Sequence, residues 1–257
     1  MLKNAPVALE LIELLGASNG LVTCVGAGGK KSVIYHLAAC YPGTVGITAT
    51  AHIERFPRAM AAYSVVAESP GLVAEVVALS KHQRVVAFAK PCDLPGRHLG
   101  ITFDELRSLR RAAAFELCLV KADGARNRIL KAPAAHEPVI PPETDTVIAL
   151  CSARAIGEPL TDRIAHRPEH IATVAGLALG ARIEPIHLGR LLASPAGALR
   201  GVGEARVIPV INMVDDATLE RQAVAAAEAA LALTTRFDYI VLAAFRNQSP
   251  LVRVVKR

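Results

Sequence analysis

Continuous apolar runs alternate with helical patterns along the chain, and this alternation restricts the fold more than any other feature. The apolar runs lie at 20–25, 44–49, 63–68, 84–89, 115–122, 146–151, 206–213 and 239–244. The helical patterns lie at 31–41, 70–81, 102–112, 168–180 and 215–233. Continuous apolar strands separated by helices are typical of parallel sheets buried on both faces. We therefore predict an α/β fold, a three-layer αβα sandwich with a mainly parallel sheet.

The chain has 257 residues, enough for one large domain or for a main domain with a small appendage. Its pattern changes over 155–203, where helical pieces alternate with glycine-containing and proline-containing segments. We predict a main αβα domain formed by 1–154 plus 204–257, and a small, mainly helical insertion at 155–203.

The net charge of +6 comes from basic residues that are scattered along the chain. Because they form no long Lys/Arg block, the charge favours phosphates or an acidic partner and argues against nucleic acid. The N-terminal segment is interrupted by Glu10 and Glu13, which is typical of an amphipathic helix rather than a signal peptide. We expect no membrane-spanning segment.

Cysteine usage indicates the compartment. The five cysteines are an odd number and contain no CxxC pair, a pattern typical of reduced thiols, so we expect a cytoplasmic protein. We also expect that no cysteine has a histidine or a second cysteine beside it that could activate it.

A glycine-rich turn separates the first apolar run from the first long helical pattern. Gly26, Gly28 and Gly29 follow the run, and Lys30, Lys31 and Ser32 open the helix. Glycine lets a backbone curl around a phosphate, and a helix N-terminus directs amide protons towards it. The sequence therefore predicts a phosphate site, and a tight turn without a ligand is the alternative.

The turn differs from the P-loop motif G-x-x-x-x-G-K-[ST] at two positions. Cys24 stands at the first glycine position, and Lys31 stands where the motif has a Mg²⁺-binding hydroxyl. Ser32 could replace that hydroxyl only if the loop shifts by one residue. The pattern predicts a modified nucleotide site.

Two further segments contain polar residues after apolar runs. Asp123 follows the run at 115–122, the place of a residue that holds Mg²⁺ or a water molecule. Asn212 and Asp215 follow the run at 206–213, with the spacing of the guanine-reading motif N-K-x-D. Met213 occupies the lysine position of that motif.

The sequence resembles the YqeC-type accessory proteins of selenium-dependent molybdenum hydroxylases, a family of selenium cofactor biosynthesis proteins. The matching blocks follow one another in the family's order. The matching blocks are "GAGGKKS", "ADGARNRILKAPAAHEPVIP", "AIGEPL", "HRPEHI" and "INMVDD". The second block is the family's signature, and it places Lys131, His136 and Glu137 in a proline-bounded loop. The resemblance implies a substrate or switch role for these three residues, with His136 as a proton carrier. A structural loop fixed by its prolines is the alternative.

The resemblance implies a nucleotide-binding accessory protein, a predicted NTPase that binds ATP or GTP. Gly26, Gly28, Gly29, Lys30, Lys31 and Ser32 would hold the phosphates, Asp123 would act in catalysis and as the Mg²⁺ ligand, and Asn212 and Asp215 would bind the base. A molybdenum hydroxylase or its cofactor would be the partner. The alternatives are a non-hydrolysing nucleotide-binding or phosphate-binding adaptor, and a small-molecule kinase or nucleotidyl transferase.

The chain departs from the family at Lys31, where the family has a hydroxyl, at Lys121, where it has Glu, and at Met213, where it has Lys. If Lys31 and Lys121 face the phosphates, their charges would partly replace Mg²⁺, so that binding persists while hydrolysis falls. His166 and His170 stand four residues apart, but Pro168 lies between them. This spacing favours a helix that starts after His166 over a shared metal ion.

Overall fold

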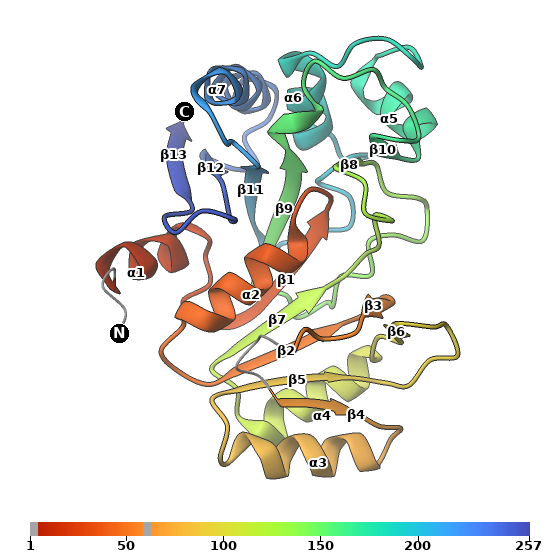
Figure 1. Cartoon of the computed structure of the whole chain (residues 1–257), viewed down its shortest axis with the longest axis vertical. Coiled ribbons are helices and arrows are strands. Elements are labelled where there is room, and N and C mark those ends of the chain that lie inside the picture. Colours follow the sequence, from red (N-terminus) through yellow and green to blue (C-terminus); the bar gives the residue numbers. More distant parts are fainter. Residues whose placement is uncertain (1–4, 59–62) are drawn as a thin grey trace. The chain divides into compact units, whose positions relative to one another are not determined.

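The structure, a computed structural model, describes residues 5–58 and 63–257 (Figure 1). The helices of this part of the chain are α1 (Ala5–Leu14), α2 (Lys30–Cys40), α3 (Gly71–Ser80), α4 (Phe103–Ala113), α5 (Pro168–Ala175), α6 (Pro185–Ala193) and α7 (Ala217–Leu233), together with the short 3-10 helix η1 (Ala153–Ala155). Among the described residues, no helix combines the length and the apolar character needed to cross a membrane.

Nine strands form one mainly parallel sheet, which confirms the predicted α/β fold class. They are β1 (Gly20–Gly26), β2 (Val45–Ala49), β4 (Tyr63–Val66), β5 (Val85–Ala89), β7 (Leu117–Lys121), β9 (Thr146–Ser152), β11 (Arg206–Asn212), β12 (Tyr239–Ala243) and β13 (Leu251–Lys256). Strands β2, β5, β7 and β9 are buried along their whole length, as their continuous apolar sequences predict. Short two-residue strands form two small ladders outside this sheet: β3 (Ile53–Glu54) with β6 (Arg97–His98), and β8 (Leu130–Lys131) with β10 (Ala165–His166).

The chain divides into two compact units. The first contains Met1–Cys24, Val33–Gly124 and Val139–Thr146, and the second contains Val25–Ser32, Ala125–Pro138 and Val147–Arg257. In the first unit the strands follow the order β1-β7-β2-β5-β4, and every neighbouring pair is parallel. In the second unit the order is β9-β11-β12-β13. There β12 pairs in parallel with β11 and antiparallel with β13.

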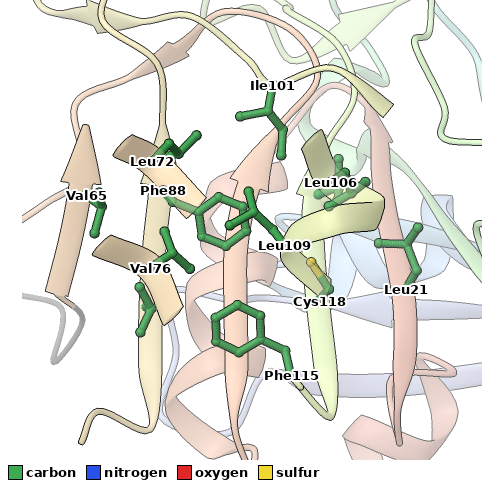
Figure 2. Packing of buried hydrophobic residues seen from close by; sticks show 12 residues of the cluster. Leu21, Val65, Leu72, Val76, Phe88, Ile101, Leu106, Leu109, Phe115 and Cys118 are labelled. Carbon is green, nitrogen blue, oxygen red and sulfur yellow. The ribbon is translucent and has the colours of Figure 1, made fainter. Parts of the chain in front are cut away.

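The core of the first unit lies between its strands and the helices α3 and α4. Phe88 of β5 and Phe115 stack with ring centroids 6.0 Å apart, and Leu109 of α4 is fully buried beside them (Figure 2). Figure 2 shows these side chains and those of Leu72 and Val76 from α3 directed towards one another. These contacts hold α3 and α4 against one face of the strands through apolar burial, which contributes roughly 25 cal/mol per Å².

Most predicted elements are confirmed. The differences are the end of one helix and elements whose bounds the sequence did not predict. All eight predicted strands are present, and the helix predicted at 168–180 is shorter because it ends at Ala175. Gly176 adopts a left-handed conformation (φ 68°) and donates its N–H to the Ala172 carbonyl, which closes the helix. Strand β13 was not predicted, and helix α6 lies in the segment 155–203, which was predicted as mainly helical without bounds for its helices.

The segment 155–203, predicted as a mainly helical insertion, lies within the second unit and contains β10, α5 and α6. Its separation from a main domain of 1–154 plus 204–257 stays a prediction.

Candidate functional site

The glycine loop consists of the residues between the end of β1 and the start of α2. Gly26, Gly28 and Gly29 have φ angles of 89°, 82° and 126°. These values lie in the region that glycine enters without strain and that other residues rarely adopt. The loop therefore has a backbone shape that requires glycine at these three positions.

Neighbouring strands approach the loop so closely that side chains would not fit. A Cβ atom on Gly26 would lie 2.2 Å from the Leu150 carbonyl oxygen, and one on Gly28 would lie 2.8 Å from Ser152 Cβ. The N–H of Ala27, in the same loop, donates to the Leu150 carbonyl at 2.9 Å. The end of β9 thus fixes one side of the loop.

Asn212 fixes the loop from the end of β11. Its side chain is almost fully buried, its Nδ2 donates to the Gly28 carbonyl at 2.7 Å, and its Oδ1 accepts from the Phe245 N–H at 3.2 Å. A Cβ atom on Gly29 would lie 2.2 Å from Asn212 Nδ2. Both ends of the amide serve contacts within the protein, so the geometry gives Asn212 a positioning role. Its contact with a base stays a prediction.

Lys30 is the first residue of α2, and its ammonium group folds back over the loop. The side chain is buried, and Nζ donates to the Gly26 carbonyl. Lys31 and Ser32 follow in the same helical turn and are half-buried, and the first turn contains no acidic residue. Backbone amides at a helix start and two lysines give this end of α2 a positive electrostatic potential, which favours an anion.

Asp215, the second predicted base-binding residue, lies in the same unit as the loop and is held by an arginine. Arg154 Nε donates to Asp215 Oδ2 at 2.6 Å, and the backbone N–H of Arg154 donates to Ser152 Oγ at 3.2 Å. Met213 adopts a left-handed conformation (φ 61°) and brings its sulfur within 3.2 Å of the same Ser152 hydroxyl. The contacts of Ser152 thus connect the predicted base-binding segment to Gly28 of the loop.

Asp123 and Lys121 belong to the first unit. Asp123 is buried, and the described part of the chain contains no group of three or more His, Cys, Asp or Glu residues suited to a metal ion. Mg²⁺ bound with substrate phosphates needs only one or two carboxylates, so the metal role of Asp123 stays a prediction. Lys121 donates through Nζ to the His52 carbonyl at 2.8 Å. The hypothesis that Lys121 faces phosphates gains no support from this contact.

The predicted substrate or switch loop is tied down by a charged cluster. Lys131 Nζ lies 2.9 Å from Glu137 Oε2, and Arg167 Nη1 lies 2.6 Å from the same oxygen. The Lys131 side chain is only 1% exposed, whereas His136 is exposed. The structure therefore brings Lys131 and Glu137 together and adds Arg167 to them. The proton-carrier role of His136 stays a prediction.

Two pKa shifts reflect the charges of this cluster. Burial by itself would raise the pKa of Glu137, but the hydrogen bonds and charges of Lys131 and Arg167 outweigh it and lower this pKa to about 2. Burial lowers the pKa of His166 to about 4, with help from Arg167, Lys131 and Arg126 and against the charge of Glu137. Glu137 is therefore a carboxylate and His166 a neutral imidazole at neutral pH.

His166 and His170 have different surroundings. His166 lies in β10, and His170 Nδ1 lies 3.3 Å from the Pro133 carbonyl oxygen. Helix α5 begins at Pro168, as the sequence predicts.

Fold and loop together define an αβα protein with a glycine-rich strand-to-helix loop. The chain belongs to the YqeC protein family, whose pattern it matches over residues 22–169. It is similar to "Uncharacterized protein YqeC" of Escherichia coli (strain K12), with 27% identity over 190 residues that cover 71% of each chain. The family match includes the glycine loop, Asp123 and the cluster around Glu137.

Three contact residues of these sites were not singled out from the sequence: Ser152, Arg154 and Arg167. A signal existed for Ser152, because it follows an apolar strand, as Asp123 does. Arg154 and Arg167 act through partners 61 and 30 residues away, a relation that spacing does not reveal.

Cys40 has a histidine beside it, which was not predicted from the sequence. Cys40 Sγ lies 3.6 Å from His36 Nε2, four residues apart on α2. Burial raises the pKa of Cys40 despite the charge of Arg84, and burial lowers the pKa of His36. Both shifts oppose a thiolate–imidazolium pair, so this contact does not activate the thiol.

Replacing Gly26 by alanine tests the packing of the loop, with Gly157→Ala as a matched control. Both glycines lie in the second unit and have nearly equal positive φ angles, 89° and 91°, so alanine is disfavoured by φ at both positions. A Cβ on Gly157 meets nothing within 4 Å, whereas one on Gly26 meets the Leu150 carbonyl. We expect Gly26→Ala to lower the free energy of unfolding by about 1–3 kcal/mol more than Gly157→Ala in urea titrations. Equal losses would show that the loop is not tightly packed.

The pH dependence of stability tests the Glu137 cluster. The pKa of Glu137 falls from its ordinary value of 4.5 to about 2 on folding, so its stabilising contribution is complete above pH 4.5 and is lost as the pH falls towards 2. We expect Glu137→Gln to be less stable than the unsubstituted protein at neutral pH, with a difference in unfolding free energy that shrinks over this range. The exposed Glu158→Gln is the control and should differ little from the unsubstituted protein. A Glu137→Gln difference that stays constant over the same range contradicts the assignment.

Proposed function

We propose that this protein binds ATP or GTP through its glycine loop and hydrolyses it, as an accessory protein in the maturation of selenium-dependent molybdenum hydroxylases. One observation carries the nucleotide part of the proposal. Three glycines with positive φ angles lead into α2, and the buried Lys30 folds over their backbone. The maturation role rests on the family resemblance of the sequence blocks.

Phosphates are the ligands that suit this loop best. Backbone amides at the start of α2 would bind phosphate oxygens, and Lys30 would exchange the Gly26 carbonyl for a phosphate oxygen. Lys31 and Ser32 follow in the first helical turn, where a cation and a hydroxyl would reach the same group. Phosphoryl transfer requires mainly positioning and charge stabilisation, which a rigid loop and two lysines can contribute.

Mg²⁺ would neutralise charge on the phosphates when bound. Asp123 is the candidate for holding it, because carboxylate oxygens are among its preferred ligands. The role of Asp123 comes from its place after β7 and from the resemblance. Asp215 and Asn212 remain the proposed base-binding residues, with Asn212 acting chiefly through the loop.

A non-hydrolysing nucleotide-binding adaptor is the second candidate function. Lys31 stands at the position of the usual metal-binding hydroxyl, and this substitution favours the adaptor function. A cation there stabilises a bound polyphosphate but does not order a metal ion. The two candidates differ in the release of inorganic phosphate, which only the first predicts.

Thermal unfolding with ATP and GTP, with Mg²⁺ and with EDTA, tests the binding. At a nucleotide concentration of about 100 times Kd, binding should add about 2.7 kcal/mol of stability and raise Tm by several degrees. Lys30→Ala should lose most of this shift, whereas the exposed Lys81→Ala should keep it. A Tm that no nucleotide changes would overturn the proposal, and strict dependence on Mg²⁺ would contradict substitution of the metal by Lys31.

The maturation role has a separate test. Deleting the gene in the source organism should lower the activity of a selenium-dependent molybdenum hydroxylase while the amount of its polypeptide stays the same. Unchanged hydroxylase activity would contradict that role and leave nucleotide binding to be judged by the thermal data.

A further inference from the structure

The cluster around Glu137 brings several cations to one place in the second unit. Strands β8 and β10 pair in parallel and set His166 opposite Lys131. Arg167 follows His166 directly and enters α5 in a left-handed conformation, with φ 64°. Its guanidinium group and the Lys131 ammonium group converge on the same carboxylate oxygen of Glu137. We call Arg126, Lys131, Glu137, His166 and Arg167 the Arg167 cluster.

The Arg167 cluster contains more positive than negative charge. The charges that act on the His166 imidazole are three cations, Arg126, Lys131 and Arg167, and one carboxylate, Glu137. Because His166 is neutral at neutral pH, these groups together carry two net positive charges. Arg126 is exposed, whereas Lys131 and Arg167 are largely withdrawn from water, where a positive charge is stabilised by an anion.

The donors of the cluster suit an oxyanion. Within the part of the chain that the structure describes, Arg167 donates to Glu137 through Nη1 only, so its other N–H groups can bind a ligand. A guanidinium group binds tetrahedral oxyanions with two parallel hydrogen bonds, and a lysine adds a point charge. The neutral imidazole of His166 can accept a hydrogen bond from a protonated ligand oxygen or donate one to an ionised oxygen.

We propose that the Arg167 cluster binds a small dianionic oxyanion of the phosphate type, either free or as the phosphate group of a phosphorylated molecule. This site is additional to the glycine loop and does not depend on nucleotide binding. The bound oxyanion competes with Glu137 for the Arg167 and Lys131 cations. Glu137 therefore holds the two cations in place and at the same time weakens ligand binding.

Calorimetric titration of the full chain with inorganic phosphate, at fixed ionic strength, tests this site. All variants carry Lys30→Ala so that the glycine loop does not contribute. In this background phosphate should still bind, and Arg167→Gln should weaken it about tenfold or more, as the loss of a charge-assisted hydrogen bond implies. The neighbouring exposed Arg163→Gln is the matched control and should change Kd less than about twofold.

Glu137→Gln separates ligand binding from a purely structural role. It removes an ion pair, so the protein should become less stable, yet phosphate should bind more tightly because the competing carboxylate is gone. If the cluster were only structural, Glu137→Gln would weaken phosphate binding or leave it unchanged. Should Arg167→Gln fail to fold, Arg126→Gln serves instead, because Arg126 is exposed and lies outside the two ion pairs.

A second titration, with phenyl phosphate in place of inorganic phosphate, distinguishes a free oxyanion from the phosphate group of a phosphorylated molecule. Binding of both compounds supports the site and indicates a phosphorylated molecule, whereas binding of inorganic phosphate alone supports the site and indicates a free oxyanion. The proposal is overturned if Lys30→Ala abolishes phosphate binding, or if the Arg167 and Arg126 substitutions leave Kd unchanged.

Discussion

The contact between the glycine loop and the ends of β9 and β11 is the constraint on which the candidate nucleotide site depends. A loop with positive φ angles has few intrinsic reasons to keep one shape, because glycine moves freely in the unfolded chain. Here the Leu150 carbonyl binds Ala27, and the Asn212 amide binds Gly28, so the loop backbone is fixed on two sides. Amides fixed in this way can meet a ligand without first being ordered.

Buried cations are the second common element of the two candidate sites. Lys30 and Lys131 are both buried, and each directs its ammonium group to an oxygen of the protein, the Gly26 carbonyl in one case and the Glu137 carboxylate in the other. Burial of an ammonium group is costly unless such a partner is present. Both partners are also groups that an anionic ligand could replace, which is why we propose ligand binding at both places.

The sequence predicted the architecture well because the strands of this sheet are buried on both faces. Continuous apolar runs such as those of β5 and β7 are recognisable without knowledge of their partners. Strand β13 was missed because Arg253 interrupts its apolar pattern and its residues are only partly buried, as expected at a sheet edge. The predicted helix at 168–180 was too long because Gly176 could be tolerated inside a helix, and only the structure shows that it ends one.

The candidate sites were predicted only in part, because a sequence shows local patterns but not the contacts between distant residues. Glycines and lysines at a strand-to-helix junction have a local signature, and so does a polar residue that follows an apolar strand. Pairing between distant residues has none, which is why Arg154 with Asp215 and Arg167 with Glu137 came only from the structure. The contact of the Lys121 ammonium group with the His52 carbonyl also came only from the structure, and the phosphate contact of Lys121 stays a prediction.

Hydrogen–deuterium exchange over the glycine loop, with and without nucleotide, addresses the central claim most directly. If the loop amides and Lys30 bind a polyphosphate, saturating ATP or GTP slows exchange at the amides of residues 26–32 more than elsewhere in the second unit. Exchange at these amides that stays unchanged under the same conditions would contradict the account.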